Sequence, residues 1–298
     1  MIKNILWLVL LLLFFTGTGF AQNKTIVFQT DFGVKDGAVS AMKGVAMSVS
    51  PDLKLFDLTH EIPAYNIWEA AYRLEQTVVY WPAGTVFVSG VDPGVGTARK
   101  SVVLKTKSGH FIVTPDNGTL TLIAASLGIE SIREIDEAVN RRKNSERSYT
   151  FHGRDVYAYT AARLAARVIS FEQVGKELAK EVVTIPFQKA VIEGQKIKGM
   201  IPVLDVQYGN IWTNIPAELF NTLNVKPGEK LHVVIYKNMV KKYDGLVPFS
   251  ETFGAVANGK PLAYLNSLMQ LSFAINMGDF SKTYKVYSGN EWMVEVSK

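Results

Sequence analysis

The sequence predicts an α/β protein in which a mostly parallel sheet with helices on its faces comes first and a mainly antiparallel β domain or barrel follows. Two observations support this prediction. Between residue 24 and about residue 185, short apolar runs typical of buried strands alternate with segments of helical period. After about residue 190 the helical period weakens, and Gly or Pro separates strand-like runs.

The individual elements follow from these two periods. The first expected helix has apolar side chains three and four positions apart, and Pro51 ends it. A hairpin is expected where Ser108 and Gly109 separate two apolar runs. In the first region, strands are expected at residues 25–29, 53–58, 85–91, 101–105 and 110–114, and helices at 37–49, 68–80 and 155–169. In the second region, strands are expected at residues 198–207, 230–237, 285–287 and 292–296.

The first 21 residues have the layout of a secretory signal peptide. Lys3 provides a positive start, residues 5–15 are all apolar, and the small residues Gly19 and Ala21 mark a cleavage point. An uncleaved anchor is the alternative, but the run is shorter than the about 20 apolar residues that span a bilayer. We therefore expect an exported protein of a bacterial periplasm, with no stable membrane anchor after cleavage. The predicted division is a signal peptide at 1–21, an α/β domain at 22–188 and a β domain at 189–298.

Composition and charge exclude several kinds of site. The chain has no Cys, which excludes disulfides and Cys–metal sites, and its four His show no metal-ligand spacing. The net charge of +5 comes from scattered Lys and Arg. Short basic clusters at residues 141–143 and 241–242 are expected on a solvated surface. We therefore expect no metal site and no nucleic-acid partner.

Unusual polar residues follow the predicted strands. Asp31 comes after the first strand, His60 and Glu61 after the second, and Asp92 after the third. Ligands of open α/β sheets bind outside the carboxyl ends of the strands, so a site is expected there. Asp31 can accept hydrogen bonds from a ribose diol, although a role in the turn is equally open. Asp92 begins an Asp-Pro-Gly turn, which local structure alone could explain, and Arg99 can pair with it across that turn.

Three further stretches carry polar side chains. His152 stands in a Gly-containing turn before a helix, where core packing explains it poorly, although lone His residues are more often structural. Asp205, Tyr208 and Asn210 follow a predicted strand and suit a ligand that is part cationic and part planar, with a strand-end turn as the alternative. The Tyr-Leu-Asn-Ser stretch that ends at Ser267 is equally compatible with ordinary strand pairing.

Taken together, these motifs resemble those of one family, the S-adenosylmethionine (SAM) hydroxide adenosyltransferases, a group that also contains SAM-dependent chlorinases and fluorinases. The resemblance runs from about Ile26 to the last predicted strands. It rests on the order and spread of TDFG from residue 30, DLTHEIP from 57, VDPGVGTAR from 91, PDNG from 115, FHGRD from 151, YGNIWTN from 208 and YLNS from 264.

The resemblance implies a Rossmann-like first domain, a C-terminal β-barrel, and a homotrimer with active sites between neighbouring subunits. It implies hydrolysis of SAM to adenosine and methionine, with SAM as substrate and no cofactor. Asp92, Arg99 and His152 would form a catalytic triad at the attacking water. The substrate-binding residues would be Asp31 at the ribose, Asp205 at the methionine ammonium, Ser267 at its carboxylate, Tyr65 and Tyr208 beside the adenosine, and Asn210 and Met277.

The triad also indicates a mechanism and an alternative. His152, with an ordinary pKa of about 6.5, suits proton transfer near neutral pH and is expected to assist deprotonation of the water. The Asp92 carboxylate would repel a halide, so we expect a hydrolase and not a halogenase. Leu268 stands where halogenating members carry Arg, and Tyr208 replaces a more usual Phe. The alternative function is an exported nucleoside-binding protein with vestigial catalysis or none.

Overall fold

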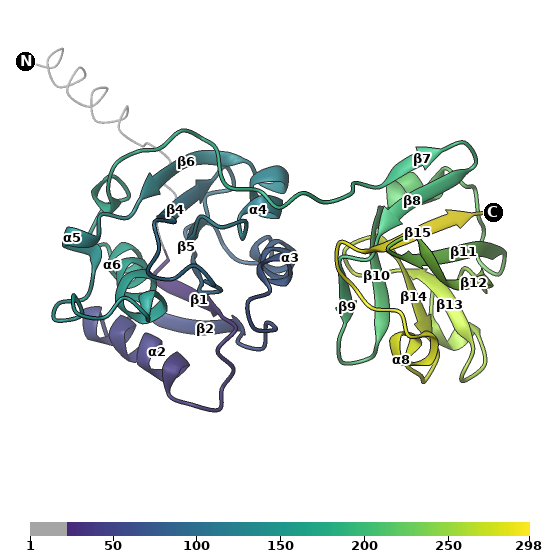
Figure 1. Cartoon of the computed structure of the whole chain (residues 1–298), viewed down its shortest axis with the longest axis horizontal. Coiled ribbons are helices and arrows are strands. Elements are labelled where there is room, and N and C mark those ends of the chain that lie inside the picture. The colour runs from purple at the N-terminus through teal and green to yellow at the C-terminus, as the bar shows by residue number, and fades with distance from the viewer. Residues whose placement is uncertain (1–22) are drawn as a thin grey trace, which may run out of the picture. The chain divides into compact units, whose positions relative to one another are not determined.

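The computed structural model describes residues 23–298, so the predicted signal peptide lies outside the described residues. These residues divide into two compact units (Figure 1). The first contains residues 23–70 and Thr77–Val183, and the second contains Ala71–Gln76 and Thr184–Lys298. The domain boundary at residues 188 and 189 stays a prediction. No helix from residue 23 onward has the length and apolar character needed to cross a membrane.

A six-stranded sheet forms the centre of the first unit, in the order β2-β1-β3-β5-β4-β6 (Figure 1). The strands are β1 (Thr25–Gln29), β2 (Lys54–Thr59), β3 (Val86–Ser89), β4 (Ser101–Thr106), β5 (Phe111–Pro115) and β6 (Ile129–Glu134). β2, β1, β3 and β5 pair in parallel, whereas β4 pairs antiparallel with both β5 and β6. The predicted α/β class and the β4–β5 hairpin are confirmed, and the sheet is mixed.

Helices bury the central strands on one face of this sheet. Met42 and Ala46 of α2, together with Ala161 of α6, pack in one core with Ile26 and Val88 from the strands. The α-helices of the unit are α2 (Ala38–Val49), α3 (Ile67–Val78), α4 (Thr121–Ser126), α5 (Glu137–Asn140) and α6 (Tyr159–Ala165), and a 3-10 turn covers Glu172–Val174.

The predicted helix at residues 155–169 differs from the observed one at both ends, since α6 already stops at Ala165. A π-helical segment, Gly153–Ala158, precedes α6, and His152 is its N-cap residue. Gly153 fits this position because a Cβ there would lie 3.2 Å from the Phe32 ring. Short π-helical segments are rare and are frequently found at functional sites. The local sequence indicated the helix but not this change of pitch.

Two antiparallel sheets form most of the second unit, in the orders β13-β14-β10-β9 and β12-β11-β15-β8-β7. The strands are β7 (Val191–Glu193), β8 (Lys196–Met200), β9 (Val203–Asp205), β10 (Asn210–Pro216), β11 (Lys230–Lys237), β12 (Val240–Pro248), β13 (Pro261–Leu265), β14 (Gln270–Ile275) and β15 (Trp292–Ser297). Both sheets contribute apolar side chains to one core. The mainly antiparallel character is confirmed, but the described strands form two sheets and no closed barrel.

Two strand predictions in this unit are corrected. The strand expected at residues 285–287 is absent, because α8 (Phe280–Tyr284) ends at Lys285 in the left-handed conformation, with φ of 54°. Val286 is buried from a loop, which explains its strand-like apolar signal. The strand expected at 198–207 is interrupted between β8 and β9, where Pro202 lacks the N–H that a continuous ladder needs. The remaining helical segments are α7 (Ala217–Asn221) and a 3-10 turn at Phe253–Ala255.

Candidate active site

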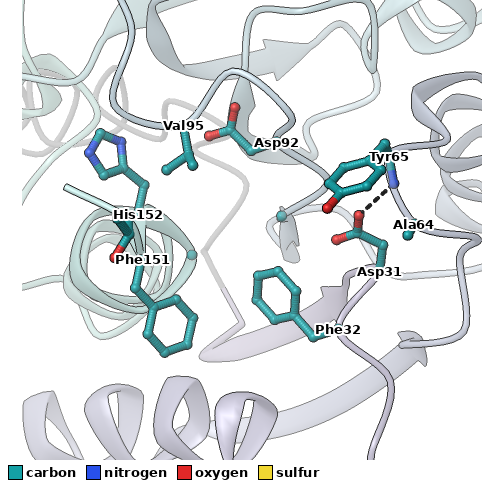
Figure 2. A pocket seen from close by; sticks show the side chains of 11 residues that line it. Asp31, Phe32, Ala64, Tyr65, Asp92, Val95, Phe151 and His152 are labelled. Atoms are coloured by element: carbon teal, nitrogen blue, oxygen red, sulfur yellow. Dashed lines mark hydrogen bonds between the residues drawn. The ribbon is translucent and has the colours of Figure 1, made fainter.

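The polar residues that follow β1 and β3 gather at one pocket. β1 lies between β2 and β3, so the connections from β1 and β2 lead toward opposite edges of the sheet. Such a reversal opens a crevice at the carboxyl ends of the strands, which is where open α/β sheets bind ligands. A pocket of about 300 Å³ lies here, the lower end of the range for small-molecule sites. Its lining includes Asp31, Phe32, Tyr65, Asp92, Phe151 and His152 (Figure 2).

The Asp31 carboxylate stands on one side of this pocket. Its Oδ2 accepts a hydrogen bond of 2.8 Å from the backbone N–H of Tyr65, which Figure 2 shows as a dashed line. Tyr65 has φ of 68°, an uncommon conformation for a residue with a side chain. The hydrogen bond therefore holds the Tyr65 turn against the carboxylate. Within residues 23–298 no protein group donates to Oδ1 of Asp31, which leaves that oxygen to a ligand.

A buried hydrogen-bond chain supports the residue before Asp31. The Thr30 hydroxyl lies 2.8 Å from Nδ1 of His60, and Nε2 of His60 lies 3.0 Å from Oδ1 of Asp57. Lys43 in turn donates to the other Asp57 oxygen at 2.6 Å. These contacts explain His60 as a structural residue that fixes the turn into the pocket.

Asp92 and Arg99 form a two-point ion pair across the turn after β3. Nε of Arg99 donates to Oδ1 of Asp92 at 2.9 Å, and Nη2 donates to Oδ2 at 2.6 Å. The Tyr157 hydroxyl also donates to Oδ2, at 2.9 Å. Burial raises the pKa of the Tyr157 phenol well above its ordinary value, and the Asp92 charge acts in the same direction, so the phenol stays a donor. Three donors thus orient the carboxylate, and one lone pair of Oδ1 remains for a ligand.

His152 lies between two guanidinium groups. Its Nδ1 is 2.7 Å from Nη2 of Arg99, and its Nε2 is 3.0 Å from Nη2 of Arg141. The residue is only 3% exposed. Burial lowers the pKa of His152 below its ordinary value, and Arg99 and Arg141 lower it further, against the opposite effects of Glu137 and Asp92. The imidazole is therefore neutral at physiological pH.

A second pocket, of about 680 Å³, lies in the second unit at the turn between β9 and β10. The backbone N–H groups of Tyr208 and Gly209 donate to the Asp205 carbonyl, and the Asn210 amide donates to Oδ2 of Asp205 at 3.1 Å. Met277 also lines this pocket and is 85% exposed. The structure thus brings together four predicted binding residues, Asp205, Tyr208, Asn210 and Met277.

Ser267 is the one predicted binding residue that lines neither of these two pockets. It is exposed in the turn between β13 and β14, where the Asn266 side chain accepts from the backbone N–H groups of Leu268 and Gln270. The turn geometry accounts for Asn266, whereas Ser267 is left free to meet a ligand or solvent.

Gly209→Ala is expected to destabilise the protein by about 2–3 kcal/mol, the sum of a strained backbone and a lost helix cap. Gly209 has φ of 67°, and a Cβ there would overlap Oδ1 of Asp279. That oxygen accepts from the N–H of Lys282 at 2.7 Å and caps α8. Gly194→Ala is the matched control, because Gly194 has φ of 62° and open space around it. Equal losses in chemical denaturation would show that the Asp279 contact contributes nothing.

Two family models match the chain. The model of the SAM hydroxide adenosyltransferase N-terminal domain matches residues 26–175, and that of the C-terminal domain matches residues 199–293. The chain belongs to the SAM hydroxide adenosyltransferase family. The resemblance seen in the motifs is thereby confirmed over most of the sequence.

Individual members of the SAM hydroxide adenosyltransferase family and one solved structure agree with this assignment. The (R)-S-adenosyl-L-methionine hydrolase of Methanocaldococcus jannaschii is 38% identical over 73% of this chain and 80% of its own length. The fluorinase of Nocardia brasiliensis is 28% identical over 91% of this chain and 96% of its own. The crystal structure of an uncharacterized conserved protein from Thermotoga maritima has a TM-score of 0.84 at 35% identity, and the match covers 92% of this chain and 100% of that one.

In this SAM hydroxide adenosyltransferase family member, sequence reasoning missed the residues that contact the triad from outside it. Tyr157 reaches Asp92, and Arg141, paired with Glu137, reaches His152. The prediction that residues 141–143 lie on a solvated surface is wrong for Arg141, which is 8% exposed. Glu137 and Arg141 are four residues apart, a spacing that signals a helical ion pair but not its contact with an imidazole. Among residues 23–298, no group of three or more acidic or His side chains is arranged to hold a metal ion.

Proposed function

We propose that the chain hydrolyses S-adenosyl-L-methionine to adenosine and L-methionine by displacement at the ribose C5′. The observation that carries this proposal is the hydrogen-bonded set of Asp92, Arg99 and His152 at a pocket that also presents Oδ1 of Asp31, to which no group of residues 23–298 donates. Asp31 would bind the ribose hydroxyls. The relatives named (R)-S-adenosyl-L-methionine hydrolase support the substrate class.

Most of the remaining binding groups belong to the second pocket. Its Asp205 would bind the methionine ammonium, and Tyr208 would flank the adenosine together with Tyr65 of the first pocket. Ser267 would bind the methionine carboxylate. The proposal includes a homotrimer with active sites between neighbouring subunits. Tyr208 and Met277 are exposed, so their side chains would be available to such a shared site. Light scattering of the purified protein gives its subunit number, and a monomer that turns over SAM would contradict this part.

The proposed displacement needs help mainly on the side of the nucleophile. The water oxygen forms a bond to C5′ while the C5′–S bond breaks. The electron pair of the C5′–S bond goes to the sulfur, which leaves as a neutral thioether. No general acid is therefore required, but the water must lose a proton. Oδ1 of Asp92 retains a lone pair that accepts a hydrogen bond from this water and would take its proton as the O–C5′ bond forms. The apolar walls formed by Phe32, Val95 and Phe151 favour a step in which separated charges are consumed.

No 5′-halo-5′-deoxyadenosine is expected when the protein is incubated with SAM and excess chloride or fluoride. A carboxylate in the nucleophile position repels an anion, and the proposal assigns that position to Asp92, which is paired with Arg99. Chromatography of the nucleosides, with adenosine release in the same samples as the internal control, makes the measurement. A halonucleoside that accumulates over many turnovers would contradict the assignment of Asp92.

The activity itself is tested on the chain from residue 22 onward, with the two sulfonium epimers of SAM supplied separately. The (R) label in the relatives' name refers to sulfur, because L already describes the α-carbon. Adenosine and methionine released in equal amounts over many turnovers would support the enzyme. Retention of one nucleoside per site without turnover would instead support the alternative, a nucleoside-binding protein, and would overturn the proposal.

Export to a bacterial periplasm is also part of the proposal. Its support is the charge and apolar pattern of the first 21 residues, together with the absence of Cys. N-terminal sequencing of the protein recovered from the periplasmic fraction of the producing cells tests both export and cleavage. A start at Met1, or recovery only with the membranes, would contradict this part.

A further inference from the structure

Both ring nitrogens of His152 face guanidinium groups. Nη2 of Arg99 lies 2.7 Å from Nδ1, and Nη2 of Arg141 lies 3.0 Å from Nε2. A guanidinium carries only N–H donors and remains charged in proteins, so neither arginine can accept a hydrogen bond from the ring. In any hydrogen bond between His152 and one of these arginines, the ring nitrogen must therefore be the acceptor.

A neutral imidazole has one lone pair and one N–H, so only one of the two contacts is a hydrogen bond. The shorter distance belongs to Nδ1 and Arg99. Arg99 is also the better anchored donor, because its other N–H groups bind Asp92 and Ser101. This places the lone pair on Nδ1 and the proton on Nε2, where it faces the Arg141 charge.

We infer that Arg141, anchored by Glu137, is a positioning residue that keeps His152 neutral with its Nδ1 accepting from Arg99. A protonated ring would present an N–H to each guanidinium and would add a third positive charge to the pair. The neutral ring instead gives Arg99 a fixed acceptor, and so holds the guanidinium that orients Asp92. His152 then acts on the water through Arg99 and Asp92, which differs from the base role expected from its ordinary pKa.

Four charged groups around the ring influence whether His152 is protonated. Arg99 comes from the turn after β3 and Arg141 from the end of α5, and the acidic groups that oppose them are Asp92 and Glu137. The neighbouring aromatic rings are those of Tyr149 and Tyr157, each with its centroid 6.3 Å from that of His152. Arg141 also lies over the Tyr149 ring, at 4.7 Å, which fixes the guanidinium from its open side.

Glu137 determines where the Arg141 charge sits. Nε and Nη2 of Arg141 both donate to Oε2 of Glu137, and the same Nη2 points at His152. The Arg141 side chain is 5% exposed, so the charge is screened little by solvent. Loss of Arg141 would leave the Glu137 carboxylate as the nearest charge on that side, which favours protonation of the ring.

The test combines NMR of His152 with the pH dependence of hydrolysis. In the unmodified protein labelled with ¹⁵N-histidine, and with signals assigned through His152→Gln, we expect Nδ1 unprotonated and Nε2 protonated at pH 7 to 8. In Arg141→Met we expect the pKa of His152 to rise, because one of the two positive charges that lower it is removed while burial and Arg99 still act. When both proteins are followed from pH 8 to pH 5.5, kcat/KM should therefore begin to fall at a higher pH in Arg141→Met than in the unmodified protein.

Arg142→Met is the matched control, because Arg142 is the next residue and its half-exposed side chain faces Asp155 and not His152. It should titrate as the unmodified protein does. Arg141→Lys should restore part of the low-pH activity, because it returns the charge without the two-point contact to Glu137.

The kinetic arm rests on the proposed function, whereas the NMR arm does not. A protein that never releases adenosine would overturn the proposed function and leave the tautomer measurement intact. A proton on Nδ1, or titration of His152 near pH 6.5 in the unmodified protein, would overturn the inference even if SAM is hydrolysed. If Arg141→Met does not fold, the tautomer in the unmodified protein still decides.

Discussion

Asp92→Asn is expected to lower kcat for SAM hydrolysis about 10²–10⁴-fold, the range that assistance to proton transfer usually contributes. The amide is nearly isosteric, but it brings N–H donors to a place where Arg99 and Tyr157 already donate. One side of the Arg99 contact is thereby broken, and the group that accepts a proton from water loses its charge. KM should change far less than kcat, because the proposal places Asp92 at the nucleophile and assigns the ribose to Asp31.

Asp36→Asn is the matched control for this substitution. Asp36 lies in the connection from β1 to α2 and is exposed. Within residues 23–298 it accepts only from the N–H of Ala38, at 2.9 Å, and an amide oxygen can replace that acceptor. Steady-state kinetics of both variants at pH 8 make the comparison. If Asp92→Asn keeps kcat within about threefold of the control, the carboxylate plays no part in the chemical step, and the proton goes elsewhere.

Asp31→Ala is expected to lower kcat/KM about 10²-fold, because a hydrogen bond to a charged group contributes about 1.5–3 kcal/mol and a ribose diol offers two donors. The loss should appear mainly in KM, since the contact exists before and during the reaction. Asp31→Asn separates two roles of the residue. The amide oxygen can still accept from the N–H of Tyr65 and hold the turn, so this variant should lose about tenfold, the value of one charge-assisted contact.

Inhibition by adenosine and by 2′,3′-dideoxyadenosine provides the measurement. The unmodified protein should bind adenosine more tightly, because the dideoxy compound lacks both donors. In Asp31→Ala the two inhibitors should bind alike. A variant that still discriminates between them as strongly as the unmodified protein would place the ribose hydroxyls against another group.

Much of the first unit could be predicted from the sequence. β1 was expected at residues 25–29 and is found at Thr25–Gln29, and α2 ends at Val49, as Pro51 indicates. These elements are short and almost wholly buried or strictly amphipathic, so one period identifies each. The pocket could be located too, because Asp31 and Asp92 directly follow parallel strands, and the ends of such strands meet at one edge of the sheet.

The sequence predicted that the second unit is mainly antiparallel β, but it did not predict which strands pair. Strand β10 was not expected, and strand pairing was only an alternative for the stretch that ends at Ser267. β10, β13 and β14 nevertheless form most of the four-stranded sheet. Their residues mix Trp, Asn, Ser and Tyr with aliphatic side chains, and such strands depend on cross-strand neighbours more than on intrinsic preference. Whether antiparallel strands close into a barrel or form two sheets also depends on strand register and twist, and the pattern of apolar residues does not reveal either.

The class of each unit, the position of the pocket and the family could all be predicted from the sequence, since these depend on local periods and on motifs that are contiguous in the chain. The surroundings of His152 could not, because they depend on how distant segments fold together. Arg99, Arg141 and Tyr157 come from three separate segments, and their burial depends on which elements pack over them. A basic cluster in the sequence predicts a solvated arginine, but the fold buries Arg141 beside His152. Its charge affects the protonation of His152 because that burial excludes water.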